Sequence, residues 1–282
     1  MLALTQLALL GRILLMGIER PLVKMLGTQR SSVEVAFLFF SIATVMFFPF
    51  AAFRPVPSWD FLRYLVPAGI LYTIAFICYV RALSDGEVSL VAPLASFNVL
   101  FLFLLAVPVL GESFTLLKLL GIALIFLGTS FLSDGNPFHG LRHVFKDRAC
   151  ILMLVSTLLV AVGRIIDKSA AADPLTYSLL IYFLISLLMF LYLLVKGRAR
   201  QPLALFRERP VIALACGFTN AYAYLLLLVV IQTMEVSIAE PATNLSLLLA
   251  VFLGKVFFRE NIRGRVFSAA AMIAGVWVLI LG

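Results

Sequence analysis

The amino-acid sequence predicts an all-α integral membrane protein with ten transmembrane helices, arranged as two inverted five-helix repeats. Of its 282 residues, 63% are hydrophobic and 13% are charged, whereas an ordinary soluble domain is about 25% charged. Apolar stretches near the ~20 residues needed to cross a bilayer recur along the whole chain. The chain also repeats itself at a constant offset of 148 residues, which takes Glu87-Val88-Ser89, Pro93 and Glu112 to Glu235-Val236-Ser237, Pro241 and Glu260.

The 148-residue register extends well beyond that block. It pairs Ile18-Glu19-Arg20 with Ile166-Asp167-Lys168, Gly69 with Gly217, and Ala75 with Ala223. We interpret this as the duplication of one unit, with a first repeat at 1–133, a linker at 134–148 and a second repeat at 149–282. If each repeat crosses the membrane an odd number of times, the two copies face opposite ways. This architecture allows a transporter to expose one site to either side in turn.

The transmembrane segments are predicted in chain order from the apolar stretches. They lie at about 2–24, 33–53, 61–83, 88–110 and 114–133, and then at about 149–171, 175–196, 210–232, 236–258 and 264–281. Their length and lack of alternating polarity favour helices over barrel strands, which would be about ten residues long and two-faced. The first segment has no basic lead and has a counterpart at 149–171, so we expect no cleaved signal peptide.

Cysteine, histidine and charge patterns argue against other classes. The three cysteines have unrelated spacings and both histidines lie in the linker, so we expect neither a disulfide framework nor a metal site. The net charge of +8 comes from Lys and Arg in short inter-helix loops, so we expect no nucleic-acid partner. The odd-numbered loops hold 16 of these basic residues and the even-numbered loops five, which predicts that both termini lie outside the cytoplasm.

Two arginines fall within predicted membrane segments. Arg12 lies near the middle of the first segment and Arg164 lies inside the sixth. A central arginine costs about 2.5–3.5 kcal/mol even on a lenient insertion scale, so each should face the bundle interior or a wet cavity. Asp167 and Lys168 follow Arg164 on the same helical face. These charges either contact substrate or form inter-helix salt bridges, and the sequence leaves both alternatives open.

Polar residues and prolines recur together in the fourth and ninth segments. A proline inside a span removes a backbone hydrogen bond and kinks the helix, which exposes a carbonyl group to a substrate or ion. We therefore predict a central site with kinks at Pro93 and Pro241, and the alternative is a packing kink. The candidate polar residues on these two segments are Ser96, Asn98, Glu240 and Asn244. Asn98 points away from Ser96 and could instead join two helices.

The third and eighth segments carry aromatic and polar residues at equivalent positions. Tyr72, Phe76 and Tyr79 have helical spacing, and Asn220 and Tyr224 occupy the positions equivalent to Tyr72 and Phe76. Such a face suits a pocket wall, although an aromatic belt at the membrane interface is the alternative for Tyr79. Small residues in the fifth and tenth segments predict helix packing instead, at Gly121, Gly128, Ala271 and Gly275.

Two sequence motifs carry a resemblance to a known family. E-V-S-L-V-A-P at 87–93 opens the fourth segment, G-E-S-F-T-L-L-K-L-L-G at 111–121 precedes the fifth, and weaker copies lie at 235–241 and 259–269. In order and spacing these motifs resemble the EamA type of the drug/metabolite transporter superfamily, over the whole chain. The resemblance implies outward movement of amino acids or related metabolites through a cavity lined by segments 1, 3, 4, 6, 8 and 9. It also implies cytoplasmic termini, which conflicts with the loop charge count.

The sequence therefore predicts a secondary transporter in a membrane, expected to be the prokaryotic inner membrane. We expect a monomer that exports a small polar metabolite with an anionic group by alternating access, with the lipid bilayer as its surroundings. No enzyme motif or cofactor-binding motif is present, so we expect neither catalysis nor a cofactor. The alternatives are a lipid or lipid-linked sugar flippase and an exchanger of organic anions or phosphorylated metabolites. The candidate substrate contacts are Arg12, Arg164, Lys168, Tyr79, Ser96, Asn98, Tyr224, Glu240 and Asn244.

Overall fold

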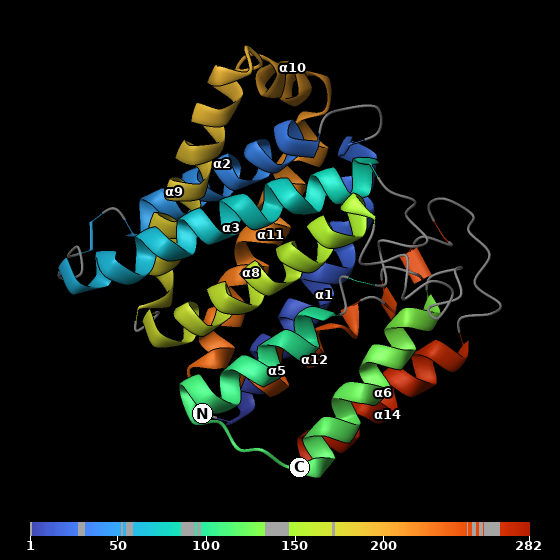
Figure 1. The fold of residues 1–282 in the computed structure, drawn as a ribbon. Helices are drawn as coiled ribbons and strands as arrows, with labels where there is room; N and C mark the ends of the chain where they lie inside the picture. The colour runs from blue at the N-terminus through green and yellow to red at the C-terminus, as the bar shows by residue number, and fades with distance from the viewer. Residues whose placement is uncertain are drawn as a thin grey trace. The chain divides into compact units, whose positions relative to one another are not determined.

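The structure is a computed structural model of the 282-residue chain. It describes residues 2–27, 32–51, 53–54, 59–85, 94, 97–132, 147–170, 173–246, 248–249, 252–253, 256 and 266–282. Every element of regular structure in these ranges is a helix (Figure 1). Pro93 and Ser96 lie outside the described residues, as does most of the linker.

The helices follow the predicted segments. In the first repeat they are α1 (Leu2–Gly27), α2 (Ser32–Ala51), α3 (Trp59–Asp85), α5 (Phe97–Leu110) and α6 (Leu116–Leu132). In the second repeat they are α8 (Arg148–Ala170), α9 (Pro174–Val195), α10 (Gln201–Glu208), α11 (Pro210–Ile231), α12 (Val236–Thr243) and α14 (Val266–Leu281). In the described part of the chain, five helices are long and apolar enough to cross a membrane, and α5, α6 and α14 contain shorter apolar spans. The chain is an all-α membrane protein with a two-repeat, ten-helix organisation.

Helix α10 was not predicted from the sequence. It is an eight-residue helix in the loop between α9 and α11, with Pro202 in its first turn, where a missing backbone N–H does no harm. Pro202 and Leu205 are buried while most of its other side chains are exposed. The segment is too short and too polar to resemble a membrane span, so hydropathy alone predicts a loop here.

The described helices form two compact units. The first unit contains residues 1–73 and 166–233, in which α1 packs against α11, and α2 packs against α9 and α11. At one end of this unit Arg198 lies 3.8 Å from Glu34, and at the other end Arg54 donates to Asp173 at 3.0 Å. Helices α2 and α9 therefore run antiparallel, as expected for the second and seventh predicted segments of a chain in which every segment crosses the membrane.

Glycines at equivalent positions of the two repeats allow close helix packing in the first unit. A Cβ atom at Gly69 would collide with Leu184 of α9, and one at Gly217 would collide with Ile42 of α2. The 148-residue offset relates these two glycines. Each small residue lets a neighbouring helix approach closely. In a lipid bilayer the hydrophobic effect does not drive helices together, so such close packing supplies much of their attraction.

The second unit contains residues 74–165 and 234–282. Helices α6 and α14 lie side by side in it (Figure 1), and a Cβ atom at Gly121 or Gly275 would lie 2.8 Å from the other residue's carbonyl oxygen. Helix α8 is joined to α3 by Ser156, whose hydroxyl donates to the Ala75 carbonyl at 2.8 Å. The outward faces of α6 and α14 are apolar, with Leu116 77% and Trp277 65% exposed.

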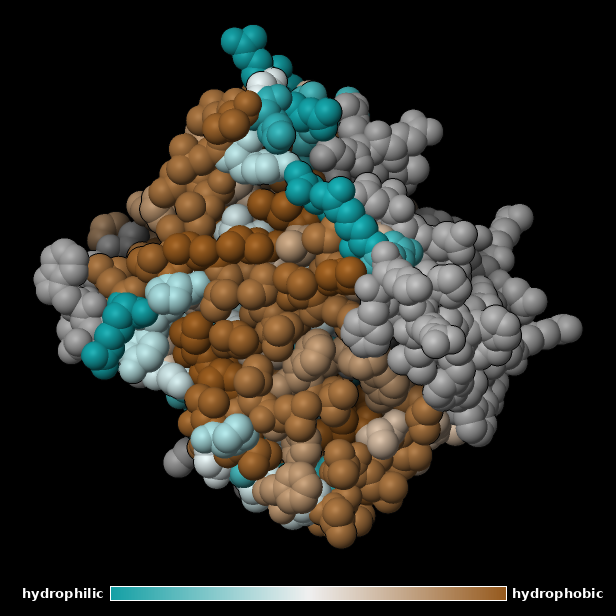
Figure 2. Space-filling model, viewed as in Figure 1, coloured by the Kyte–Doolittle hydropathy of each residue, from teal (hydrophilic) through white to brown (hydrophobic). Residues whose placement is uncertain are grey.

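Exposed apolar side chains are a general feature of the described surface. Figure 2 shows that they dominate the described residues on the face in view. A soluble monomer rarely exposes contiguous apolar patches larger than a few hundred Å², so lipid is the solvent that this surface fits. Each compact unit takes helices from both sequence repeats, because α1 and α2 of the first repeat pack with α9 and α11 of the second.

Candidate functional site

Arg12 is buried in the first unit. It is 2% exposed, and its Nη1 donates to the carbonyl oxygen of Ala223 in α11 at 2.9 Å. The next residue on α11 is Tyr224, whose ring lies edge-on to Tyr182 with 5.3 Å between centroids. The arginine predicted to face the interior does so, and it contacts helix backbone beside an aromatic pair.

Asp167 forms a buried polar centre in the same unit. Its carboxylate is fully buried and accepts hydrogen bonds from the hydroxyls of Tyr72, at 2.6 Å, and Tyr177, at 2.7 Å. The two tyrosines come from α3 and α9. Beside it on α8, the Lys168 ammonium donates to the carbonyl oxygen of Ile231 at the end of α11. Lys168, a predicted substrate contact, is thus engaged with the backbone of a neighbouring helix.

Glu19 forms a second polar centre, on α1. Its Oε1 accepts a hydrogen bond from the side-chain amide of Asn220 at 2.9 Å. The Tyr182 hydroxyl donates to the amide oxygen of Asn220 at 2.8 Å, which fixes the amide with its NH₂ group toward Glu19. Tyr182 is itself held between the rings of Phe47 and Tyr224.

In the second unit the structure pairs Arg164 of α8 with Glu240 of α12. The guanidinium Nε and Glu240 Oε1 form an ion pair in which the two side chains are 15% and 7% exposed. Thr243, one turn further along α12, donates its hydroxyl to the Glu240 carbonyl at 2.6 Å and lies 3.2 Å from its carboxylate. Two predicted candidates from distant parts of the sequence are therefore neighbours.

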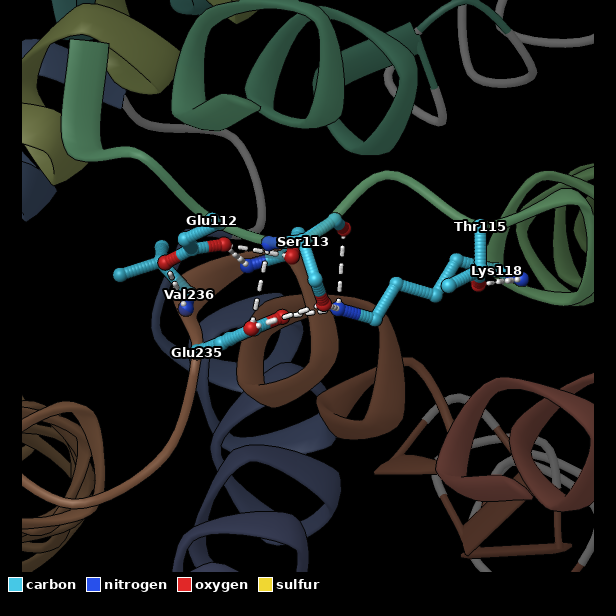
Figure 3. Close-up of polar contacts among 7 residues, drawn as sticks. Glu112, Ser113, Thr115, Lys118, Glu235 and Val236 are labelled. Atoms are coloured by element: carbon cyan, nitrogen blue, oxygen red, sulfur yellow. Dashed lines mark hydrogen bonds and ion pairs between the residues drawn. The ribbon is translucent and has the colours of Figure 1, made fainter. Parts of the chain in front are cut away.

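The loop before α6 supplies a carboxylate to the start of α12. Glu112 Oε1 accepts from the backbone N–H of Val236 at 2.7 Å, and Oε2 accepts from the N–H of Ser237 at 3.0 Å and from its hydroxyl (Figure 3). These N–H groups have no partner within a helix, and the positive end of the helix dipole favours a carboxylate. Gly111 has a φ of +67°, which turns the chain so that Glu112 points at the helix.

A second contact ties the same loop to the residue before α12. The Lys118 ammonium, 2% exposed, binds the carboxylate of Glu235 and both the hydroxyl and the carbonyl of Ser113 (Figure 3). The Ser113 hydroxyl also donates to Glu235 at 3.1 Å. Burial raises the pKa of Glu235, but the hydrogen bonds from Lys118 and Ser113 outweigh it, and the pKa lies below its usual value.

The remaining predicted residues have less defined surroundings. Tyr79 is 39% exposed, and its ring centroid lies 6.1 Å from that of Phe76 on the same helix. Asn244 caps the C-terminus of α12, which ends two residues after Pro241. The Oδ1 of Asn98 and the Oγ of Ser246 are sealed from solvent and have no hydrogen-bond partner in the described part of the chain. The 148-residue offset relates these two positions.

Sequence reasoning missed several residues of these centres, among them Glu112, Tyr177 and Tyr182. Glu112 belongs to the repeated block, so the sequence did single it out, but only as evidence of the duplication and not as a residue that binds a helix end. Tyr177 and Tyr182 had no signal, because their equivalents in the first repeat are Gln29 and Glu34.

Comparison with known proteins identifies the family. No curated protein matches the sequence. One solved structure, titled only as the crystal structure of a protein, superposes with a TM-score of 0.78 over 98% of this chain and 97% of its own, at 15% identity, which establishes a shared fold. The sequence model of the EamA-like transporter family matches residues 4–134 and again 147–281. These matches cover most of the chain, which therefore belongs to the EamA-like transporter family.

Proposed function

We propose that this chain exports a small zwitterionic metabolite, an amino acid or a related compound, by alternating access. Membership of the family makes it an integral membrane transporter. The observation that carries the choice of substrate is the buried ion pair of Arg164 and Glu240, which joins two apolar helices of the second unit. The outward direction is taken from the family resemblance.

The energetics of a desolvated ion pair favour a zwitterionic substrate. Removing one partner of a buried ion pair leaves an uncompensated charge and costs about 3–5 kcal/mol. A zwitterion avoids this cost, because its carboxylate replaces Glu240 on the guanidinium of Arg164 while its ammonium takes the place of Arg164 on Glu240. Both protein charges stay paired in the bound state. A guanidinium also binds a carboxylate with two parallel hydrogen bonds, which adds geometric selectivity.

Competing substrates differ in the protein charge that they leave unpaired. A simple organic anion pairs with Arg164 but leaves Glu240 unpaired, and an organic cation does the reverse. We therefore expect affinity for zwitterions to exceed affinity for either by at least about tenfold, since 1.4 kcal/mol already gives that ratio. The sequence alone favours an anionic substrate, because two arginines within spans, Arg12 and Arg164, outnumber the one clearly embedded carboxylate, Glu240. Because one chain contains both repeats, we also propose that it acts as a monomer, in the inner membrane of a prokaryote.

The test is substrate counterflow in proteoliposomes. Vesicles loaded with an unlabelled amino acid should accumulate the same labelled amino acid, and should accumulate labelled succinate or putrescine far more weakly. Arg164→Gln and Glu240→Gln should each lose counterflow. Arg148→Gln is the matched control, because Arg148 lies on the same helix at its exposed first residue.

The double variant R164Q/E240Q separates recognition from structure. It removes both charges together, so it should recover the melting temperature that each single variant loses, but it should not recover transport. Counterflow by the double variant would show that the pair only stabilises the bundle. If wild-type protein moved no soluble solute and instead equilibrated a fluorescent phospholipid between leaflets, the flippase alternative would replace this proposal.

A further inference from the structure

The C-terminal turn of α9, in the first unit, carries two basic residues. The N–H of Arg198 donates to the carbonyl of Leu193 at 2.8 Å, and the N–H of Gly197 donates to the carbonyl of Leu194 at 2.9 Å. This pair of bonds ends a helix with one residue in the left-handed conformation, which Gly197 adopts with a φ of +69°. The reversal of the chain brings Lys196 and Arg198 to the walls of one cavity.

That cavity has a volume of about 310 Å³ and is lined by Val33, Tyr192, Leu193, Lys196 and Arg198. The volume is at the lower end of the range for ligand sites, about 300–1,000 Å³. Both charged residues of its lining are cations, and both are exposed, so the cavity suits an anionic group. A guanidinium forms parallel hydrogen bonds with phosphate oxygens, and an ammonium adds a point charge.

One carboxylate lies next to this cavity. Glu34 of α2 is 2% exposed, and its Oε1 lies 3.8 Å from the guanidinium of Arg198. The side-chain amide of Gln201, with its NH₂ group toward Glu34, also donates to this carboxylate at 3.0 Å. Glu34 is thus buried, whereas the Arg198 side chain is 55% exposed. The two cations outnumber the one carboxylate, so the cavity keeps a net positive charge.

The cavity lies at the depth of lipid head groups. Helix α9 has 22 residues and is long and apolar enough to cross a membrane. At 1.5 Å per residue its length is about 33 Å, slightly more than the hydrocarbon core. Lys196 directly follows its last residue, and the Lys196 ammonium lies 6.0 Å from the ring centroid of Tyr192, one turn earlier. Tyrosine and lysine at the end of a span are typical of the membrane interface, where lipid phosphates lie.

An apolar stripe on α9 leads to the same turn. Leu187, Leu191, Leu194 and Val195 are all exposed, and their helical spacing places them along one side of α9. Figure 2 shows apolar surface over α9 that gives way to hydrophilic residues at the end next to α10. An acyl chain that packs on this stripe brings its head group to the cavity. Free phosphate gains nothing from this surface.

We propose that the cavity binds the phosphate group of an anionic phospholipid such as phosphatidylglycerol, with an acyl chain along the apolar stripe of α9. Lys196 and Arg198 bind the phosphate oxygens. Basic pockets between transmembrane helices are suited to anionic head groups. The site does not depend on the proposed substrate, whose contacts Arg164 and Glu240 lie in the second unit.

The test is native mass spectrometry of the full chain in detergent micelles, titrated with dioleoyl phosphatidylglycerol. Wild type should retain one such lipid, and should retain dioleoyl phosphatidylcholine, which has no net charge, far less. The variant K196Q/R198Q should bind phosphatidylglycerol at least about tenfold more weakly, since each basic residue near a membrane surface contributes roughly fivefold. R200Q/R207Q is the matched control and should bind as wild type does. It removes the same two charges from the same loop, at exposed residues outside the cavity lining.

Free phosphate and misfolding are tested separately. Displacement of the lipid by an equal concentration of inorganic phosphate would show that the cavity takes the free ion, and would overturn the lipid assignment. Equal retention of phosphatidylcholine by wild type, or equal loss of binding in K196Q/R198Q and R200Q/R207Q, would also overturn it.

A single substitution keeps the proposal falsifiable if K196Q/R198Q does not fold. Lys196→Gln leaves the contact between Arg198 and Glu34 in place and should still bind phosphatidylglycerol about fivefold more weakly. Lys196→Arg keeps the charge and should bind as wild type does. Binding that is not weakened in Lys196→Gln, or that is lost equally in Lys196→Arg, would contradict the proposal.

Discussion

Replacing Glu112 by Ala should destabilise the second unit. The carboxylate accepts from the backbone N–H groups of Val236 and Ser237, at 2.7 and 3.0 Å, and from the Ser237 hydroxyl. It is 9% exposed, so water cannot fully replace it. The variant leaves these three donors without their acceptor at the first turn of α12.

The magnitude follows from these three bonds. Losing a helix cap costs about 0.5–2 kcal/mol, and a negative charge at a helix N-terminus contributes about 0.3–1 kcal/mol more. Each additional buried donor left unsatisfied costs about 1 kcal/mol or more. We expect a loss of roughly 2–4 kcal/mol for Glu112→Ala. At about 2–4 °C per kcal/mol for a chain of this size, the melting temperature should fall by roughly 5–15 °C.

The assay is thermal unfolding of purified protein in detergent, followed by intrinsic fluorescence. Ser237→Ala removes one of the three bonds and should lower the melting temperature by about a third as much. Glu208→Ala, at an exposed carboxylate at the end of α10, is the control and should have little effect. A melting temperature of Glu112→Ala equal to that of wild type would refute this prediction. So would an equal loss of melting temperature in Glu208→Ala.

Three other outcomes follow from the structure. Gly121→Leu should lower the melting temperature sharply, because its Cβ would lie 2.8 Å from the Gly275 carbonyl oxygen and α6 would have to move away from α14. A Gly121→Leu protein as stable as wild type would show that these helices are not in close contact. Burial raises the pKa of Asp173, but hydrogen bonds, including one from Arg54, leave this pKa below its usual value. The charged carboxylate therefore stabilises the folded protein fully above the pKa of the unfolded state, and this stabilisation is lost as pH falls below about 4. Melting temperatures of Asp173→Asn should therefore depend less on pH than those of wild type in that range, and equal dependence would contradict this. Orientation can be measured with single cysteines at positions 54 and 200, in a variant without the native cysteines, and an impermeant thiol reagent on whole cells. Labelling at position 200 alone supports the family topology, and labelling at position 54 alone supports the charge count.

The apolar helices could be predicted closely from the sequence. The segments predicted at 33–53, 175–196 and 210–232 became Ser32–Ala51, Pro174–Val195 and Pro210–Ile231. Prolines stand at the start of two of these helices, and charged or turn-forming residues bound the apolar runs, so length and hydropathy determined the ends. The ninth segment differed, because α12 ends at Thr243 although the apolar run continues. Pro241 removes the backbone hydrogen bond to the residue four positions before it, inside α12, and hydropathy records neither that loss nor the end of the helix.

The candidate sites were predictable as residues but not as contacts. Arg164 and Glu240 were both singled out because each charge is costly in a membrane, yet nothing in one sequence states which helices face each other. Their pairing changes the substrate that we propose, since an isolated Arg164 would favour an anion, whereas both charges of the pair can be matched by a zwitterion. The capping role of Glu112 was hidden for a related reason. A helix cap is normally sought within a few residues of the helix, whereas this one comes from a residue more than a hundred positions away.

The internal repeat offers a physical account of which polar positions are tolerated. The 148-residue offset relates position 19 to 167, 72 to 220 and 98 to 246, and all six positions carry polar side chains. The chemistry at those positions is then free to differ, and it does: a phenol stands opposite one carboxylate and an amide opposite the other. Asp167 therefore accepts from hydroxyls where Glu19 accepts from an amide, although the sequence repeat relates the two carboxylates.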